Sequence, residues 1–210
     1  MRLIDLTLEI QGPGREGGVA RVEERHRAGG GTRYTSRVYH FAHDSMAGTY
    51  IDFPGHIQET DDGQDSASVP IERLFRVDAS VIHLDREDGS GGVSAEALQR
   101  ACAGPVEGGA LIINALGGRR FDEVVFRSVY LEKEAVRWII DTGVHLLISD
   151  IYESQALHGV FYDLFGAGVS TVCCPVNLHL LTAPHGKVTV LPLRVSGVTQ
   201  LPCRVIAEWE

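Results

Sequence analysis

Residues 43–56 read HDSMAGTYIDFPGH and concentrate titratable side chains where the flanking pattern indicates a β-strand. In an extended chain, side chains two positions apart share a face, so Tyr50 and Asp52 point the same way. Pro54 has no backbone N–H to donate and ends the strand, which leaves His56 just past it. We therefore expect a phenol, a carboxylate and an imidazole to meet at a strand end, a combination suited to acid–base catalysis.

The same residues also fit a purely structural interpretation. Asp52, which precedes Phe-Pro, can serve as a turn acceptor, and Tyr50 can be an ordinary strand aromatic. A single histidine after Pro-Gly, such as His56, is commonly a surface residue. The local pattern alone leaves both interpretations open.

Periodicity along the rest of the chain indicates many strands and few helices. Alternation of apolar and polar residues predicts strands over residues 3–10 and 203–209. Short runs rich in β-branched residues predict further strands at 36–42, 48–53, 77–84, 110–115, 145–149, 169–173 and 188–193. Helical spacing predicts helices over residues 94–103, 132–141 and 154–165. Because strands and helices do not alternate strictly, we expect one α/β or α+β domain over residues 1–210 with a mixed, strand-rich core, not a Rossmann sheet.

Composition narrows the possible partners. The chain has 210 residues, with 19 basic against 28 acidic side chains and a formal net charge of −9. This sign argues against binding to nucleic acid or to an anionic membrane. No apolar run reaches the roughly 18–20 residues that span a bilayer. Asp5 and Glu9 interrupt the opening residues where an export signal needs an unbroken apolar stretch, so we expect a cytoplasmic protein.

The cysteines show no pattern typical of a zinc ribbon or a disulfide framework. They are Cys102, Cys173, Cys174 and Cys203. None of them forms a CxxC pair, and two are adjacent. The glycines form neither GxGxxG nor a P-loop, so no motif indicates a nucleotide cofactor.

Residues 46–56 resemble the signature HxGTHxDxPxH of the cyclase family that includes bacterial kynurenine formamidase, isatin hydrolase and trans-dienelactone hydrolase. The positions that match are Gly48, Thr49, Asp52, Pro54 and His56. The first two signature histidines are replaced, by Met46 and Tyr50.

The resemblance extends over most of the chain. Residues 4–7 read IDLT, like the opening strand of the family, and His158 resembles a ligand histidine of a late helix. The family has a glutamate four residues before an Asn-Leu pair, and Cys173 stands at that position here. A Pro-Leu strand and a Pro-x-Arg strand close the family domain, as residues 192–193 and 202–204 do here. The resemblance implies the family's swivelling β/β/α fold and a homo-oligomer.

The substituted positions bear on the metal that relatives use to activate water. Met46 offers a thioether, which is a poor ligand for hard or borderline divalent ions. Tyr50 is a phenol with an ordinary pKa near ~10 and rarely replaces imidazole on zinc. We therefore expect no metal cofactor. An alternative is a mixed zinc site formed by Asp52, His158 and Cys173, since all three residue types can bind zinc.

Without a metal, the remaining groups form an acid–base set. We expect His56 to act as general base, Asp52 to orient an imidazole or act as base, Tyr50 to donate to a developing enolate, and His158 to act as a second acid. Met46, Gly48 and Cys173 are the expected substrate contacts.

These roles predict a metal-independent enzyme that closes a ring by aldol chemistry and dehydration. Its partner would be a small or aromatic, polyketide-like carbonyl compound. One alternative is a metal-dependent amide or lactone hydrolase similar to kynurenine formamidase. A second alternative is a relative without catalytic activity that binds a small molecule or another protein.

Overall fold

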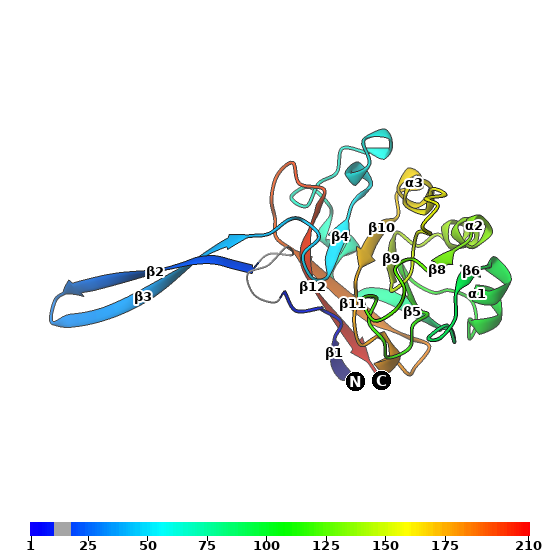
Figure 1. The fold of residues 1–210 in the computed structure, drawn as a ribbon, viewed down its shortest axis with the longest axis horizontal. Coiled ribbons are helices and arrows are strands. Elements are labelled where there is room, and N and C mark those ends of the chain that lie inside the picture. Colours follow the sequence, from blue (N-terminus) through cyan, green and yellow to red (C-terminus); the bar gives the residue numbers. More distant parts are fainter. Residues whose placement is uncertain (11–17) are drawn as a thin grey trace.

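A closed sheet of seven strands forms the centre of the computed structural model, which describes residues 1–10 and 18–210 (Figure 1). Around the barrel, the strands follow the order β4, β12, β11, β5, β7, β9 and β10. Their bounds are β4 Tyr50–Asp52, β5 Val77–His83, β7 Ala110–Asn114, β9 Leu146–Ser149, β10 Ser170–Cys173, β11 His185–Pro192 and β12 Gln200–Trp209. A further strand, β1 (Arg2–Asp5), pairs with β12 on the outside of this closure. This architecture confirms the expected mixed, strand-rich α/β core.

Helices cover the half of the barrel in which strands run parallel. β5, β7, β9 and β10 pair in parallel, whereas β4, β11 and β12 pair with antiparallel neighbours. The helices are α1 (Ala95–Ala101), α2 (Lys133–Asp141) and α3 (Val160–Gly166). A short parallel pair, β6 (Gly91–Val93) and β8 (Val129–Leu131), joins the helical layer.

Two apolar clusters lie on opposite faces of the parallel strands. Ile112 of β7 belongs to the cluster inside the barrel, while Leu111 and Ile113 belong to the cluster under the helices. Successive side chains of a strand point to opposite faces, so a strand covered on both sides is apolar throughout. All five residues of β7 are buried for this reason.

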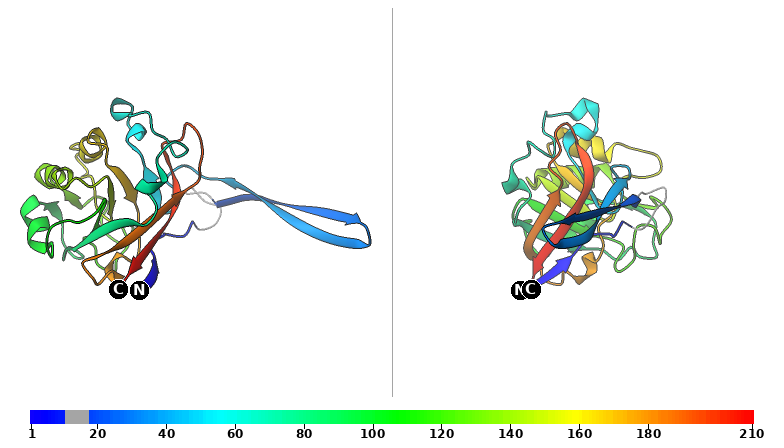
Figure 2. Two further views of the ribbon diagram at one scale, coloured as in Figure 1. Left: turned by 180° about the vertical axis from the view of Figure 1, so that it is seen from behind. Right: turned by 90° about the vertical axis from the view of Figure 1, so that its left-hand side faces the viewer.

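A long hairpin projects from the barrel (Figures 1 and 2). It consists of β2 (Gly18–Gly29) and β3 (Thr32–Ala42), which pair along their length and turn at Gly30 and Gly31. Both turn glycines have positive φ, at 56° and 84°, as tight hairpin turns require. The sequence predicted only part of β3, at residues 36–42, and did not predict β2.

The helices also correct one expected boundary. A helix was expected over residues 154–165, but α3 begins at Val160 because Gly159 before it has a left-handed backbone with φ 92°. The start of α1 is as expected, since the Ser94 side chain accepts a hydrogen bond from the Ala97 N–H. Short 3-10 turns complete the fold at η1 (Pro54–His56), η2 (Gln58–Thr60), η3 (Ile71–Arg73) and η4 (Leu178–Leu180). Across the described residues, every helix is too short or too polar to cross a membrane.

The contact between Gly186 and Trp209 gives a test of the barrel packing. A Cβ atom at Gly186 would lie 2.2 Å from the Trp209 ring, which is fully buried. We expect Gly186→Ala to lower the free energy of unfolding by about 1–3 kcal/mol, because the ring has no space to move. Gly29→Ala is the matched control, since nothing lies within 4 Å of its added Cβ. Urea denaturation measures both, and equal stability of the two variants would contradict this packing.

Candidate active site

Asp52 lies where β4 closes the barrel. Thr171 of β10 pairs with it on one side and Gln200 of β12 on the other. Asp52 is only 3% exposed. Its Oδ2 accepts hydrogen bonds from Thr171 Oγ1 at 3.4 Å and from Cys173 Sγ at 3.6 Å. Its Oδ1 has no hydrogen-bond partner within residues 1–10 and 18–210.

Burial makes Asp52 a weaker acid. Burial raises the pKa of this carboxyl. The nearby Gln200 amide and His56 ring lower it, but by less than burial raises it. Desolvation penalises the charged form, so the proton affinity of Asp52 moves toward the range useful for proton transfer.

His56 lies on the solvent side of this cluster. Its side chain is exposed at the end of η1, and its ring packs edge-on against Phe165 with centroids 6.4 Å apart. Its Nε2 is 3.2 Å from the amide nitrogen of Gln200, whose Oε1 accepts a hydrogen bond from Ser45. Gln200 therefore links His56 to the Asp52 region. Gln200 is not predicted from the sequence, because it lies 144 positions from His56 and no local pattern marks it.

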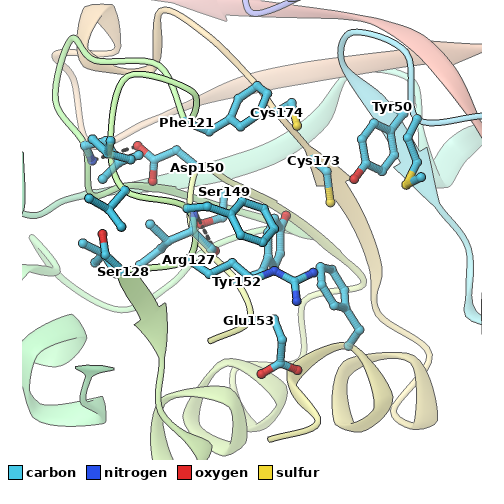
Figure 3. Close-up of a pocket in the computed structure, with 18 residues that line it drawn as sticks. Tyr50, Phe121, Arg127, Ser128, Ser149, Asp150, Tyr152, Glu153, Cys173 and Cys174 are labelled. Carbon is cyan, nitrogen blue, oxygen red and sulfur yellow. Dashed lines mark hydrogen bonds between the residues drawn. The ribbon is translucent and has the colours of Figure 1, made fainter. Parts of the chain in front are cut away.

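A cavity of about 250 Å³ opens beside the outer face of β4 and β10. Figure 3 shows Tyr50, Cys173 and Cys174 on one side of it and Asp150 and Ser149 on the other. Aromatic rings make up much of its wall, namely Tyr50, Phe121, Phe126, Tyr152 and Phe161. Arg127 is the cation among the lining residues, and its guanidinium carbon lies 4.9 Å from the centre of the Phe126 ring. The site therefore fits a flat, largely apolar molecule that carries polar oxygen atoms.

Tyr50 presents a neutral phenol to this cavity. Burial raises the pKa of Tyr50, and the neighbouring Cys173, Cys174 and Asp52 raise it further. Burial also raises the pKa of Cys173 well above its ordinary value. Both groups thus keep their protons at neutral pH, and Tyr50 can act as a hydrogen-bond donor.

Asp150 is a second acid of the cavity that the sequence analysis missed. It follows β9 directly and accepts hydrogen bonds from the backbone N–H groups of Ala115 and Leu116 at 2.9–3.0 Å. Burial raises its pKa to about 6 despite these donors. A signal was available, since a carboxylate directly after a buried parallel strand marks the end of a sheet where sites form.

The expected site residues separate into two groups. Met46, Tyr50 and Cys173 line the cavity, and contact of Met46 and Cys173 with a substrate stays a prediction. Asp52 and His56, expected as catalytic residues, are not among the lining residues; Asp52 accepts a hydrogen bond from Cys173, which is one of them.

Gly48 serves a packing role instead of lining the cavity. It is buried, has φ +65°, and a Cβ there would lie 2.8 Å from the Leu8 carbonyl oxygen and from the Ile10 side chain. Only glycine combines this backbone conformation with so close an approach. Gly48 therefore holds the segment after β1 against β4.

His158 is also separate from the cavity. Its Nε2 donates to the Leu131 carbonyl at 2.9 Å, and its Nδ1 lies 2.7 Å from Ser154 Oγ. Glu153, just upstream, accepts hydrogen bonds from the N–H groups of His158, Gly159 and Val160. Both ring nitrogens are thus engaged in holding the start of α3, and the geometry gives no support to a role as second acid.

The residues present do not fit a divalent-metal site. Within the described part of the chain, no three His, Cys, Asp or Glu side chains are grouped so that they could hold a metal ion. His158 has both nitrogens occupied, and Cys173 is a buried neutral thiol. The alternative zinc site of Asp52, His158 and Cys173 therefore has no geometric support.

Comparison with known proteins identifies the family. A family model described as "Cyclase: Putative cyclase" matches residues 4–155. The chain belongs to this family. No curated protein matches the chain.

Solved structures share the fold at low sequence identity. Isatin hydrolase A from Ralstonia solanacearum superposes with a TM-score of 0.70 at 19% identity, covering 100% of this chain and 92% of that one. A structure described as a predicted metal-dependent hydrolase from Bacillus stearothermophilus gives a TM-score of 0.66 at 18% identity, covering 98% and 97%. A structure described as a novel cyclase gives 0.72 at 14% identity, covering 98% and 88%. The expected fold of the cyclase family is confirmed.

Asp150 makes the stability of the protein depend on pH. Its pKa of about 6 in the folded protein exceeds the ~3.9 of an unfolded aspartate. At a pH between these two pKa values, Asp150 is protonated in the folded chain and ionised in the unfolded chain. Asp150 therefore stabilises the folded protein increasingly as the pH falls from about 6 toward about 4. We expect the stability of the wild type relative to Asp150→Asn to rise by ~2 kcal/mol between pH 7.5 and 4.

Urea denaturation at several pH values tests this expectation. Asp141→Asn is the control, since Asp141 is an exposed carboxylate at the end of α2. A difference between wild type and Asp150→Asn that stays constant with pH would contradict the raised pKa of Asp150.

Proposed function

We propose that this cyclase-family chain is an enzyme that closes rings by acid–base catalysis, without a bound metal, on a small or aromatic, polyketide-like carbonyl compound. The observation that carries the proposal is a neutral phenol and a carboxyl with a pKa near 6 in the walls of one aromatic cavity. A donor for an oxyanion and a proton acceptor are the two groups that enolate chemistry requires.

Tyr50 is the proposed oxyanion donor. Its pKa is raised, so its O–H proton stays in place and can form a hydrogen bond to a carbonyl oxygen as negative charge develops there. Cys173, which donates to the buried Asp52, lies beside the phenol and limits its orientation. Asp52 and Cys173 are therefore positioning residues, and His56 and Gln200 close this cluster on the solvent side.

Asp150 is the proposed proton acceptor. A carboxylate has about four acceptor sites, and three hydrogen bonds to backbone N–H groups occupy most of them. In its ionised form it takes a proton from a carbon between two carbonyl groups, which gives an enolate stabilised by Tyr50. The enolate carbon then bonds to a second carbonyl carbon of the same molecule, and the new alkoxide takes the proton back from Asp150. The new carbon–carbon bond closes the ring, and the cyclic hydroxyketone then loses an α-hydrogen and its hydroxyl group as water to give a cyclic enone.

A second candidate is hydrolysis of a cyclic amide or lactone in the same cavity. Two of the similar structures are described as isatin hydrolase A, which motivates isatin as a test compound. The third possibility, binding without catalysis, predicts that no cavity variant changes a turnover rate.

Replacing the phenol tests the proposed role of Tyr50. With a linear poly-β-ketone as substrate, we expect Tyr50→Phe to lower kcat by about 10²–10³ with little change in KM, because the lost hydrogen bond strengthens only in the transition state. Tyr130→Phe is the matched control, since Tyr130 packs against His158 outside the cavity. Unchanged kcat in Tyr50→Phe would remove the phenol from the mechanism. Turnover of isatin but not of the polyketone would favour the hydrolase.

Removal of metal tests the absence of a cofactor. We expect the purified protein to hold less than about one metal ion per ten chains and to keep its full activity in a chelator, because Met46 and Tyr50 are poor ligands. Mass spectrometry of bound metals and activity after dialysis measure this. The double variant Met46→His, Tyr50→His is the positive control for zinc uptake. Activity that is lost in chelator and restored by zinc would establish the metal-dependent hydrolase instead.

A further inference from the structure

Arg127 brings a positive charge into the aromatic cavity that the proposed reaction does not use. It is half-buried, and it is the only arginine or lysine among the described residues that line this cavity. Across residues 1–10 and 18–210, no carboxylate forms an ion pair with it, and its guanidinium carbon lies 4.9 Å from the centre of the Phe126 ring. A guanidinium has five N–H donors and no acceptor, so these donors are open to a ligand in the cavity.

Two acidic side chains line the same cavity, but backbone N–H groups already bind both of them. Asp150 accepts three such hydrogen bonds. Glu153 accepts four, from the N–H groups of residues 154, 158, 159 and 160 at 2.9–3.1 Å. A carboxylate has about four acceptor sites, so neither acid depends on Arg127 for compensation. Figure 3 shows the Arg127 guanidinium separate from both carboxyl groups.

The backbone at Arg127 is held in an unfavourable conformation. Its φ of 53° lies in the left-handed region, which side chains other than glycine rarely adopt. Hydrogen bonds fix the residues on both sides of it. The Phe126 carbonyl accepts one from Gln155 Nε2 at 2.9 Å, and the Ser128 carbonyl accepts one from the Gly91 N–H at 2.7 Å. Strained residues that the surrounding structure fixes in this way cluster at ligand-binding sites.

The ligand group that fits Arg127 is a planar carboxylate on a flat, apolar skeleton. A guanidinium matches a carboxylate through two parallel N–H···O hydrogen bonds, and this geometry is specific to a planar anion. The aromatic rings in the wall accept the rest of such a molecule, in a cavity of about 250 Å³. A doubly charged phosphate fits less well, because Asp150 and Glu153 lie in the same wall and repel additional negative charge.

We propose that Arg127 binds a carboxylate group of the substrate, so that the enzyme acts on the free acid of its carbonyl compound. This inference rests on the proposed ring closure and names the substrate class more closely. An amide or ester of the same compound carries no charge at that position and lacks the paired hydrogen bonds to Arg127. Arg127 is therefore a residue that determines specificity, while Tyr50 and Asp150 keep their proposed roles in the reaction.

Binding of two probe molecules tests the site without any turnover. Cinnamate and cinnamamide have the same flat shape and differ in charge, and isothermal titration calorimetry measures the Kd of each. We expect the wild type to bind cinnamate about 10–100-fold more tightly than cinnamamide, because hydrogen bonds between charged groups are stronger than those to a neutral amide. Arg127→Gln removes this preference and leaves the Kd of cinnamamide unchanged, which also shows that the cavity of the variant is intact.

Arg137→Gln is the matched control. Arg137 lies on α2 outside the lining residues, and its side chain is 72% exposed, so this variant keeps the preference for cinnamate. Equal Kd values of the two probes in the wild type overturn the proposal, as does a wild type that binds neither probe. A preference for cinnamate that persists in Arg127→Gln overturns it as well.

Turnover distinguishes a failure of this inference from a failure of the proposed function. We expect the free acid of a linear poly-β-ketone to have a kcat/KM about 10–100-fold above that of its primary amide, chiefly through KM, and Arg127→Gln to remove the difference. Equal kcat/KM values for acid and amide, both reduced in Tyr50→Phe, overturn the carboxylate site and leave the ring closure standing. Turnover of neither compound, with cinnamate still bound through Arg127, overturns the proposed reaction and supports the carboxylate site.

Discussion

The pairing of β4 with two strands at once is the constraint on which the site depends. β4 has only three residues, yet it forms antiparallel pairs with β10 and with β12. This closes the barrel and leaves no open edge between those strands. Ile51 thereby packs inside with Val172 and Leu201, while its neighbours on either side face outward. The same closure thus buries the carboxylate of Asp52 and presents the phenol of Tyr50 to the cavity.

Charge balance explains how this closure tolerates a buried acid. An ionised carboxylate in an apolar setting is costly unless a cation or donors compensate it. At the positions that correspond to metal ligands of the family, this chain has a thioether, a phenol and a thiol, namely Met46, Tyr50 and Cys173. All three are neutral at pH 7, since burial raises the pKa of Tyr50 and of Cys173. Because these three side chains carry no negative charge, Asp52 does not need a metal cation to balance additional anions. This is consistent with the proposed metal-independent chemistry.

Local patterns predicted the strands and the face shared by Tyr50 and Asp52, because strand periodicity is a property of neighbouring residues. They could not predict Gln200, which reaches Asp52 only through the closure of the barrel. The later start of α3 follows from the left-handed backbone of Gly159, and Glu153 accepts hydrogen bonds from the N–H groups on either side of it, which helical spacing does not encode. β2 was missed because it is rich in charged residues and residues 21–29 are almost all exposed, so this part of the strand lacks the alternation that marks a strand packed on a core.

The hairpin and the site share one stretch of chain. β3 ends at Ala42, and the next residues lead directly to Met46 in the cavity wall. Within that link, Ser45 donates a hydrogen bond to Gln200, the residue that connects His56 with the Asp52 region. The short link after β3 therefore ties the base of the hairpin to the site at two points, through Ser45 to the Asp52 region and through Met46 to the cavity wall.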